Sequence, residues 1–204
     1  MSTTTTDLHR FLRTRRSVRR FKPDPVPDSV IQNILTTASF APSAHNRQPW
    51  RFCVVTDKSV KEKLANAMAI EFERDLEKDK LPQAEIQKRA TRSRKRIISA
   101  PVVIILSVDM SDMDVYPDEK RNKAEYLMAV QSVANAGMQM LLAAHAEGLG
   151  GVWVCSPLFV QETIQNILEL PKTWEPQAMF FLGHPEDIPE VRERKLMQDI
   201  SIFI

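Results

Sequence analysis

The longest helical pattern in the chain, over about residues 121–147, is apolar almost all round. Its middle reads LMAVQSVANAGMQMLLAA. A helix without a polar face is normally buried on every side, so the rest of the fold has to cover it. Ala134, Ala136 and Gly137 would let another helix approach closely, and Gly148 is expected to end the helix.

The remaining apolar patterns predict more helices and a few strands. Asp28 is a candidate N-cap for a helix that stops at Pro42, and residues 58–98 read as a charged helical region broken near Pro82. The run PVVIILSV, from Pro101, is rich in β-branched residues and fits a strand covered on both faces. Further strands are expected in WRFCVVT, GVWVCS and QAMFFLGH.

These elements predict an α+β fold with a central sheet, formed as a single domain by residues 1–204. The long helix and the apolar C-terminal end together hold more apolar surface than a small sheet can cover. A tightly packed dimer would bury both.

Composition and charge exclude several classes of protein. The net charge of +2 does not by itself indicate a nucleic-acid partner. Cys53 and Cys155 lie far apart and form no CxxC motif, so neither a disulfide framework nor a zinc site is expected. The N-terminal MSTTTTDLHR has no apolar core of a signal peptide, and no stretch approaches about 18 uninterrupted apolar residues. A cytoplasmic protein without a membrane partner is expected.

An arginine cluster, RTRRSVRR, follows the first short helical pattern. It contains Arg13, Arg15, Arg16, Arg19 and Arg20, with Ser17 among them. The planar guanidinium group suits phosphate, and a serine hydroxyl can add a hydrogen bond. Two other interpretations are a solvated basic face and a nucleic-acid contact. The cluster is short for nucleic acid, and only Phe21 adds an aromatic ring beside it.

A polar loop, APSAHNRQPW, lies between a predicted helix and a predicted strand. Its Ser43, Asn46 and Gln48 can both donate and accept hydrogen bonds, which suits a planar heterocycle. The alternative is a structural turn whose side chains cap the preceding helix. The segment GLGGVWVCS permits close backbone approach but does not match GxGxxG, so a Rossmann nucleotide site is not supported.

The other charged and titratable groups carry weaker signals. The four histidines show no metal-binding spacing, and no HExxH or GxSxG motif is present. Most cations around SRKR, residues 93–96, are expected to pair with the acidic segment EFERDLEKD upstream. Arg192 and Arg194 in the tail read most simply as surface charges.

In order along the chain, four motifs resemble the FMN-dependent nitroreductase family. They are RRSVRRF (15–21), APSAHNRQPWRF (41–52), GLGGVWVCSP (148–157) and GHPEDIPEVRERK (183–195). The chain is most similar to short members, including the flavin-binding domain attached to deazaflavin-coenzyme glutamyl ligases. The resemblance implies a mostly antiparallel sheet packed between helices, and an obligate homodimer that completes the domain and holds FMN at its interface.

The resemblance also implies which residues contact FMN. Arg15, Arg16, Ser17 and Arg19 match positions at the phosphate, ribityl chain or pyrimidine edge. The partner chain would supply Pro42, Ser43, Ala44 and Asn46, with Gln48 bracing the loop. Val154, Cys155 and Ser156 match the segment beside the reactive N5, Arg192 and Arg194 match a basic pair at the phosphate, and Arg92 and Lys95 match positions at the flavin edge.

The implied activity is transfer of hydride from NADH or NADPH to flavin N5, and then to a nitroaromatic, quinone or related small molecule in a ping-pong cycle. No catalytic side chain and no metal are expected. Alternatives are a flavin enzyme acting on a deazaflavin-coenzyme precursor and a flavin-binding protein with little turnover. Ala44 stands where many relatives have a hydroxyl, and Cys155 where small residues are common. Residues 71–96 are expected to cover the cleft.

Overall fold

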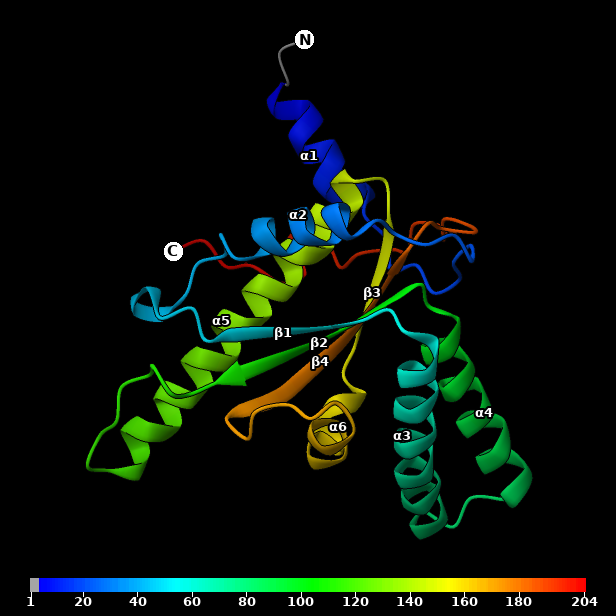
Figure 1. Cartoon of the computed structure of the whole chain (residues 1–204). Helices are drawn as coiled ribbons and strands as arrows, with labels where there is room; N and C mark the ends of the chain where they lie inside the picture. The colour runs from blue at the N-terminus through cyan, green and yellow to red at the C-terminus, as the bar shows by residue number, and fades with distance from the viewer. Residues whose placement is uncertain (1–3) are drawn as a thin grey trace.

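The structure is a computed structural model that describes residues 4–204 (Figure 1). Along the chain the elements are α1 (Thr5–Thr14), α2 (Asp28–Ala38), η1 (Ala44–Asn46), β1 (Trp50–Val55), α3 (Lys58–Lys78), α4 (Gln83–Ser99), β2 (Val102–Asp109), α5 (Glu119–Ala146), β3 (Gly150–Val154), η2 (Ser156–Phe159), α6 (Gln161–Ile167), β4 (Trp174–Gly183) and η3 (Met197–Asp199). The α+β class predicted from the sequence is confirmed.

The four strands form one antiparallel sheet in the order β1-β2-β4-β3. Every residue of β2 is buried, as its continuous apolar run predicts. Because side chains alternate along a strand, Ile104 and Leu106 join a core with α2 and α5, whereas Val103 and Ile105 join a core with α3 and α6. The sheet is therefore sandwiched between two helical layers.

Helix α5 lies directly on the sheet, and Gly137 permits this close contact. A Cβ atom added at Gly137 would lie 2.4 Å from the ring of Trp153 and 2.8 Å from the ring of Phe180. The sequence predicted a close approach by a helix at this position, but the nearest neighbours of Gly137 are side chains of the sheet. The glycine lets the middle of α5 sit where a larger residue would hold it away.

The expectation that α5 is buried on every side does not hold within one chain. Its inner face is buried, but Leu127 is 51% exposed and Met138 is 44% exposed. By length and composition α5 could span a membrane, yet half of its apolar window is buried inside the protein, as in a core helix. The outer face and the exposed apolar tail, which includes Ile202 and Phe203, leave apolar surface that this chain does not cover.

Several helix boundaries differ from the sequence predictions. Asp28 lies in the first turn of α2, and the N-cap position belongs to Pro27 without a side-chain hydrogen bond. Helix α2 ends at Ala38, before Pro42. The charged region predicted to break near Pro82 forms α3 and α4, with Pro82 at the N-cap of α4.

We expect Gly137→Ala to destabilise the fold. The added methyl group would collide with buried rings, and overpacking of a core typically costs about 1–3 kcal/mol. That cost exceeds the gain of about 1 kcal/mol in helix propensity. Urea unfolding followed by circular dichroism should show the loss, whereas Lys123→Ala on the exposed face should stay within about 0.5 kcal/mol of wild type. An equally stable Gly137→Ala variant would contradict the packing described.

Candidate functional site

Segments near the two ends of the chain, within residues 15–19 and 189–194, meet in a cationic depression, which we call the arginine hollow. It has a volume of about 140 Å³ and is lined by Arg15, Arg16, Ser17, Arg19, Pro189, Glu190, Arg192 and Arg194. The two segments run side by side because Lys22 N donates to His184 O at 2.9 Å, and Glu186 N donates to Arg20 O at 3.1 Å. Arg192 and Arg194, which read as surface charges, therefore join the N-terminal cluster.

Arg15 is one of the partly buried members of the arginine hollow. Its Nη1 atom is buried and has no hydrogen-bond partner among residues 4–204. Burial lowers the pKa of the Arg15 guanidinium, and the charges of Arg16 and Arg194 lower it further. Because a buried donor without a partner is costly, an anion in the arginine hollow would stabilise Arg15 both by hydrogen bonding and by charge.

The backbone around Ser17 is held by the edge of the sheet. Ser17 forms a parallel bridge with Gly151, and Val18 N donates to Gly151 O at 3.1 Å. A Cβ atom at Gly150 would lie 2.7 Å from that of Val18, so the glycine admits the arginine segment beside β3. The GLGG motif, which looked like a simple helix end, thus also positions the arginine hollow.

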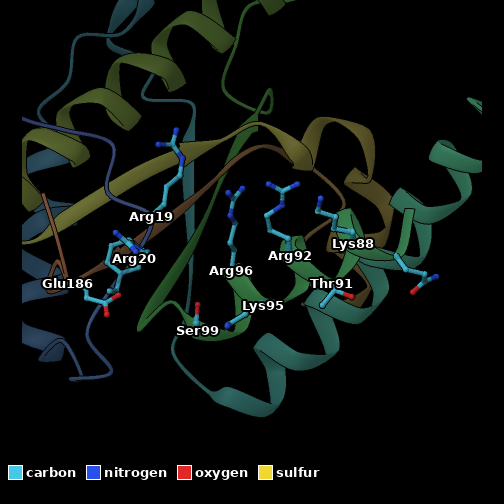
Figure 2. A pocket seen from close by; sticks show the side chains of 11 residues that line it. Arg19, Arg20, Lys88, Thr91, Arg92, Lys95, Arg96, Ser99 and Glu186 are labelled. Atoms are coloured by element: carbon cyan, nitrogen blue, oxygen red, sulfur yellow. The ribbon is translucent and has the colours of Figure 1, made fainter. Parts of the chain in front are cut away.

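A second basic depression lies next to the first, and we call it the α4 basic pocket (Figure 2). It has a volume of about 720 Å³ and is lined by Arg19, Arg20, Phe21, Gln87, Lys88, Thr91, Arg92, Lys95, Arg96, Ser99 and Glu186. Arg19 lines both depressions. The predicted site residues Arg92 and Lys95 thus lie in one pocket with Arg19, and the tail arginines do not line it.

Cys155 and Ser156 line a third hollow of about 410 Å³. Apolar side chains of α3 and η2, including Met68, Phe72 and Phe159, form much of its wall. Cys155 is exposed, and Trp153 Nε1 donates to its Sγ at 3.1 Å. The thiol therefore does not point into the core. Val154 precedes it at the end of β3.

The polar loop is attached to α5 at a separate place. Ala44 N donates to Ser132 Oγ at 3.1 Å, and Asn135 Nδ2 donates to Pro42 O at 3.2 Å. Ser43 accepts a hydrogen bond from Gln48 N at 3.1 Å and does not cap α2. None of the loop residues lines the arginine hollow of the same chain.

The conformation of the polar loop is unusual for residues with side chains. His45, Asn46 and Gln48 all have positive φ angles, of 50°, 54° and 50°. Such strain persists where surrounding contacts impose it, often at binding sites. Gln48 Nε2 lies 3.4 Å from both the backbone oxygen and the Oδ1 atom of Asn46.

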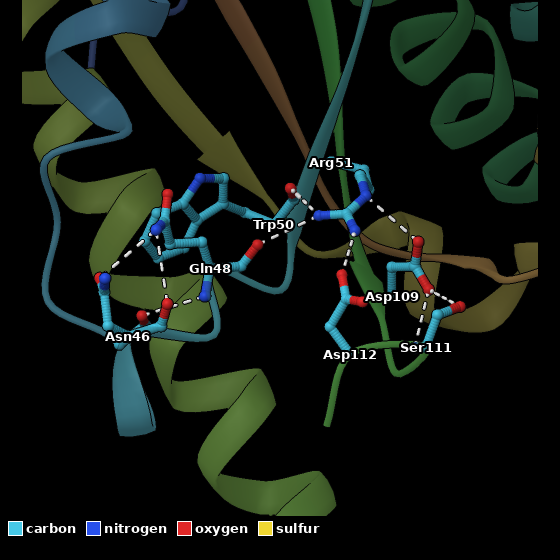
Figure 3. A network of polar contacts seen from close by, with 8 residues as sticks. Asn46, Gln48, Trp50, Arg51, Asp109, Ser111 and Asp112 are labelled. Carbon is cyan, nitrogen blue, oxygen red and sulfur yellow. Dashed lines mark hydrogen bonds and ion pairs between the residues drawn. The ribbon is translucent and has the colours of Figure 1, made fainter. Parts of the chain in front are cut away.

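The start of β1 fixes the far end of the loop (Figure 3). Arg51 donates to Gln48 O at 3.1 Å and forms an ion pair with Asp109 at 3.1 Å. Burial raises the pKa of Asp109, but hydrogen bonds from Ser111 and the charge of Arg51 outweigh it, so the net pKa lies below the ordinary value.

The structure also identifies residues that sequence reasoning missed. Arg96 and Lys88 line the α4 basic pocket with Arg92, and their spacing of four residues on one helix face was a readable signal. Ser132 and Asn135 hold the loop, but nothing in the sequence connects them to residues about 90 positions away. The expected pairing of α4 cations is only partly right: Arg94 pairs with Glu73 of α3, and Arg89 pairs with Glu85.

The geometry defines a class: an α+β protein whose N-terminal arginines, C-terminal tail and helix α4 form two adjoining basic depressions at the edge of an antiparallel sheet. The family model "Nitroreductase family" matches residues 12–184. A relative from Thermus thermophilus named NADH dehydrogenase is 30% identical over 197 residues, which cover 85% of this chain and 84% of the relative. This chain belongs to the nitroreductase family.

Solved structures agree with this assignment. One from Desulfovibrio desulfuricans, in complex with FMN, is 26% identical with a TM-score of 0.72 and covers 96% of this chain and 95% of that one. The BluB-like flavoprotein from Clostridium difficile 630 is 26% identical with a TM-score of 0.76, over 97% of this chain and 98% of that one.

Ser132→Ala should loosen the polar loop while the fold stays intact. The Ala44 amide would lose its acceptor, and a neutral hydrogen bond contributes about 0.5–1.5 kcal/mol. Amide hydrogen exchange at Ala44 should therefore accelerate by about threefold to tenfold. Gln131→Ala, next to Ser132 on an exposed position of α5, is the control and should leave the rate unchanged. Equal protection in all three proteins would show that Ser132 does not hold the loop.

Proposed function

We propose that the protein is an FMN-dependent oxidoreductase that uses NADH or NADPH to reduce a nitroaromatic, a quinone or a related small molecule. Membership of the nitroreductase family supports an oxidoreductase, the structure from Desulfovibrio desulfuricans contains FMN, and the relative from Thermus thermophilus is named NADH dehydrogenase. The proposal places the protein in the cytoplasm.

The arginine hollow carries the proposal. FMN ends in a phosphate group, and the hollow offers converging cations with a buried donor, Arg15 Nη1, which has no hydrogen-bond acceptor among residues 4–204. Arg192 and Arg194 would reach the phosphate from the tail, while Ser17 supplies a hydroxyl beside it. The residues present thus fit the phosphate end of FMN, and the arginine cluster is assigned to this group instead of nucleic acid.

The other site residues would orient the ring system. Arg92 and Lys95 lie beyond Arg19 in the α4 basic pocket, where they would reach the pyrimidine edge. Positive charge there would favour the negative charge that reduction adds. Val154, Cys155 and Ser156 would pass the ring, and their hollow, with Phe72 and Phe159, offers apolar surface to a planar substrate.

Bound FMN would supply the hydride and electron transfer at its N5, so that the protein contributes position and electrostatics. No side chain is needed as acid or base. The nicotinamide and the acceptor would use one open cleft in turn, which requires no separate Rossmann site. This is the ping-pong order proposed for the cycle.

The proposed enzyme is a homodimer. The outer face of α5 exposes Leu127 and Met138, and the polar loop beside it is strained and positioned away from the arginine hollow. A second copy packed on this face would bury the apolar surface and receive Pro42, Ser43, Ala44 and Asn46 at its own flavin. The exposed apolar tail would be covered in the same assembly.

Anaerobic reduction tests the proposed activity. The FMN-loaded protein should lose its flavin absorbance on addition of NADH or NADPH, and recover it when a quinone or nitroaromatic compound is added. A flavin that stays oxidised with both nicotinamides would contradict the reaction. In that case a passive flavin-binding role, or a biosynthetic enzyme with another electron donor, would replace it.

Met138→Glu should separate the proposed dimer and reduce FMN retention. A carboxylate in an apolar interface would be desolvated without a partner. Ile70→Glu is the matched control, because Ile70 of α3 is similarly exposed, at 49%, on the other side of the sheet. Light scattering and flavin absorbance measure both effects. A wild-type monomer, or a dimeric and fully loaded Met138→Glu protein, would contradict the proposed assembly.

A further inference from the structure

The α4 basic pocket concentrates more positive charge than its surroundings neutralise. Six cations line it, namely Arg19, Arg20, Lys88, Arg92, Lys95 and Arg96, against one lining carboxylate, Glu186. Arg92 and Arg96 extend side by side from successive turns of α4 (Figure 2). Like charges four residues apart destabilise a helix by about 0.2–0.5 kcal/mol per pair, and an anion bound in the pocket would offset this small cost.

The pairing of charges differs between the faces of α4. Arg89 and Arg94, which do not line the pocket, pair with Glu85 and Glu73. Among residues 4–204, Arg92, Lys95 and Arg96 have no carboxylate within 4.0 Å, while Lys88 lies 4.0 Å from Glu85. Helix α4 therefore directs its unneutralised cations into the pocket.

The proposed FMN does not account for all of these cations. Its phosphate belongs in the arginine hollow, and its pyrimidine edge would engage Arg19, Arg92 and Lys95. Arg20 is held by Asp187 at 2.6 Å. Arg96 remains, and so does Lys88, which lies only at 4.0 Å from a Glu85 that Arg89 contacts at 2.7 Å. The hydroxyl groups of Thr91 and Ser99 line the pocket from the same helix.

The C-terminal end of α4, which carries Arg96 and Ser99, is well anchored. The buried Lys61 of α3 donates from Nζ to Ala100 O at 2.7 Å, directly after the last turn of α4. Ile97, in the same turn as Arg96, is 1% exposed in the core. The backbone below Arg96 is thus fixed, and the site is preorganised on a rigid element.

We propose that Lys88 and Arg96 bind a second phosphate group, carried by the small molecule that exchanges electrons with the flavin. The planar guanidinium and the nearby hydroxyls suit phosphate oxygens, and the pocket volume of about 720 Å³ is that of a small-molecule site. This inference rests on the proposed function. The phosphate belongs either to NADPH, at its 2′ position, or to a phosphorylated electron acceptor.

Titration of the FMN-loaded protein with inorganic pyrophosphate tests the pocket directly. At constant ionic strength, calorimetry should show saturable binding with one site per chain. The double variant Lys88→Gln/Arg96→Gln should bind at least about tenfold more weakly, since two charge-assisted contacts are lost. Arg89→Gln removes one charge from another face of α4 and should bind as the wild type does. Circular dichroism and flavin absorbance confirm that each protein is folded and loaded.

Two results of this titration would overturn the proposal. One is the absence of saturable pyrophosphate binding to the FMN-loaded protein, as expected if FMN fills the pocket. The other is that Arg89→Gln weakens pyrophosphate binding as much as the double variant does. The titration requires no turnover, so it tests phosphate binding in the pocket even if neither nicotinamide reduces the flavin. Failure of both nicotinamides to reduce the flavin would overturn the proposed function alone.

Steady-state kinetics distinguish the two sources of phosphate. If it belongs to the donor, the double variant should lower the ratio of kcat/KM for NADPH over NADH by at least about fivefold. If the phosphate belongs to the acceptor, the ratio for NADPH over NADH should stay unchanged. In that case kcat/KM for 4-nitrophenyl phosphate should fall at least about fivefold relative to kcat/KM for nitrobenzene. Constancy of both ratios would contradict a phosphate site for a substrate.

Discussion

Gly150 lets the N-terminal arginine segment lie against the edge of the sheet, and the site depends on that contact. Without a side chain at Gly150, Val18 can approach β3, and its amide bonds to Gly151 O. This pairing covers the outer edge of β3 and fixes Arg15, Arg16 and Arg19 relative to α4. The tail then closes on the same segment through His184 and Glu186. A rigid sheet edge thus gathers charges from three distant parts of the chain.

The sequence predicted those parts of the fold that follow from local pattern. The apolar run in β2 predicted a strand covered on both faces, and the run around residues 121–147 predicted the long core helix. The family resemblance added the antiparallel sheet and the grouping of Arg15, Arg16, Ser17 and Arg19 with the tail arginines, which one hollow now contains. Without the family resemblance, Arg192 and Arg194 read as surface charges, because no local sequence pattern relates residue 194 to residue 15.

Other features depend on tertiary contacts that a single sequence does not encode locally. Gly137 was read as a place for a neighbouring helix, but rings from β3 and β4 occupy the space. Ser132 and Asn135 became visible as loop anchors only once α5 and the polar loop were placed together. The charges of α4 divide between paired and unpaired faces, and the sequence could not say which of them α3 would neutralise.

The central claim is that the arginine hollow holds the phosphate of FMN. Titration of the flavin-free protein with FMN and with riboflavin, which lacks that phosphate, tests it most directly. Charge-assisted hydrogen bonds contribute about 1.5–3 kcal/mol each, and 1.4 kcal/mol is a factor of ten. Two such contacts predict that FMN binds at least about 100-fold more tightly than riboflavin. Equal affinity for the two flavins would contradict the account.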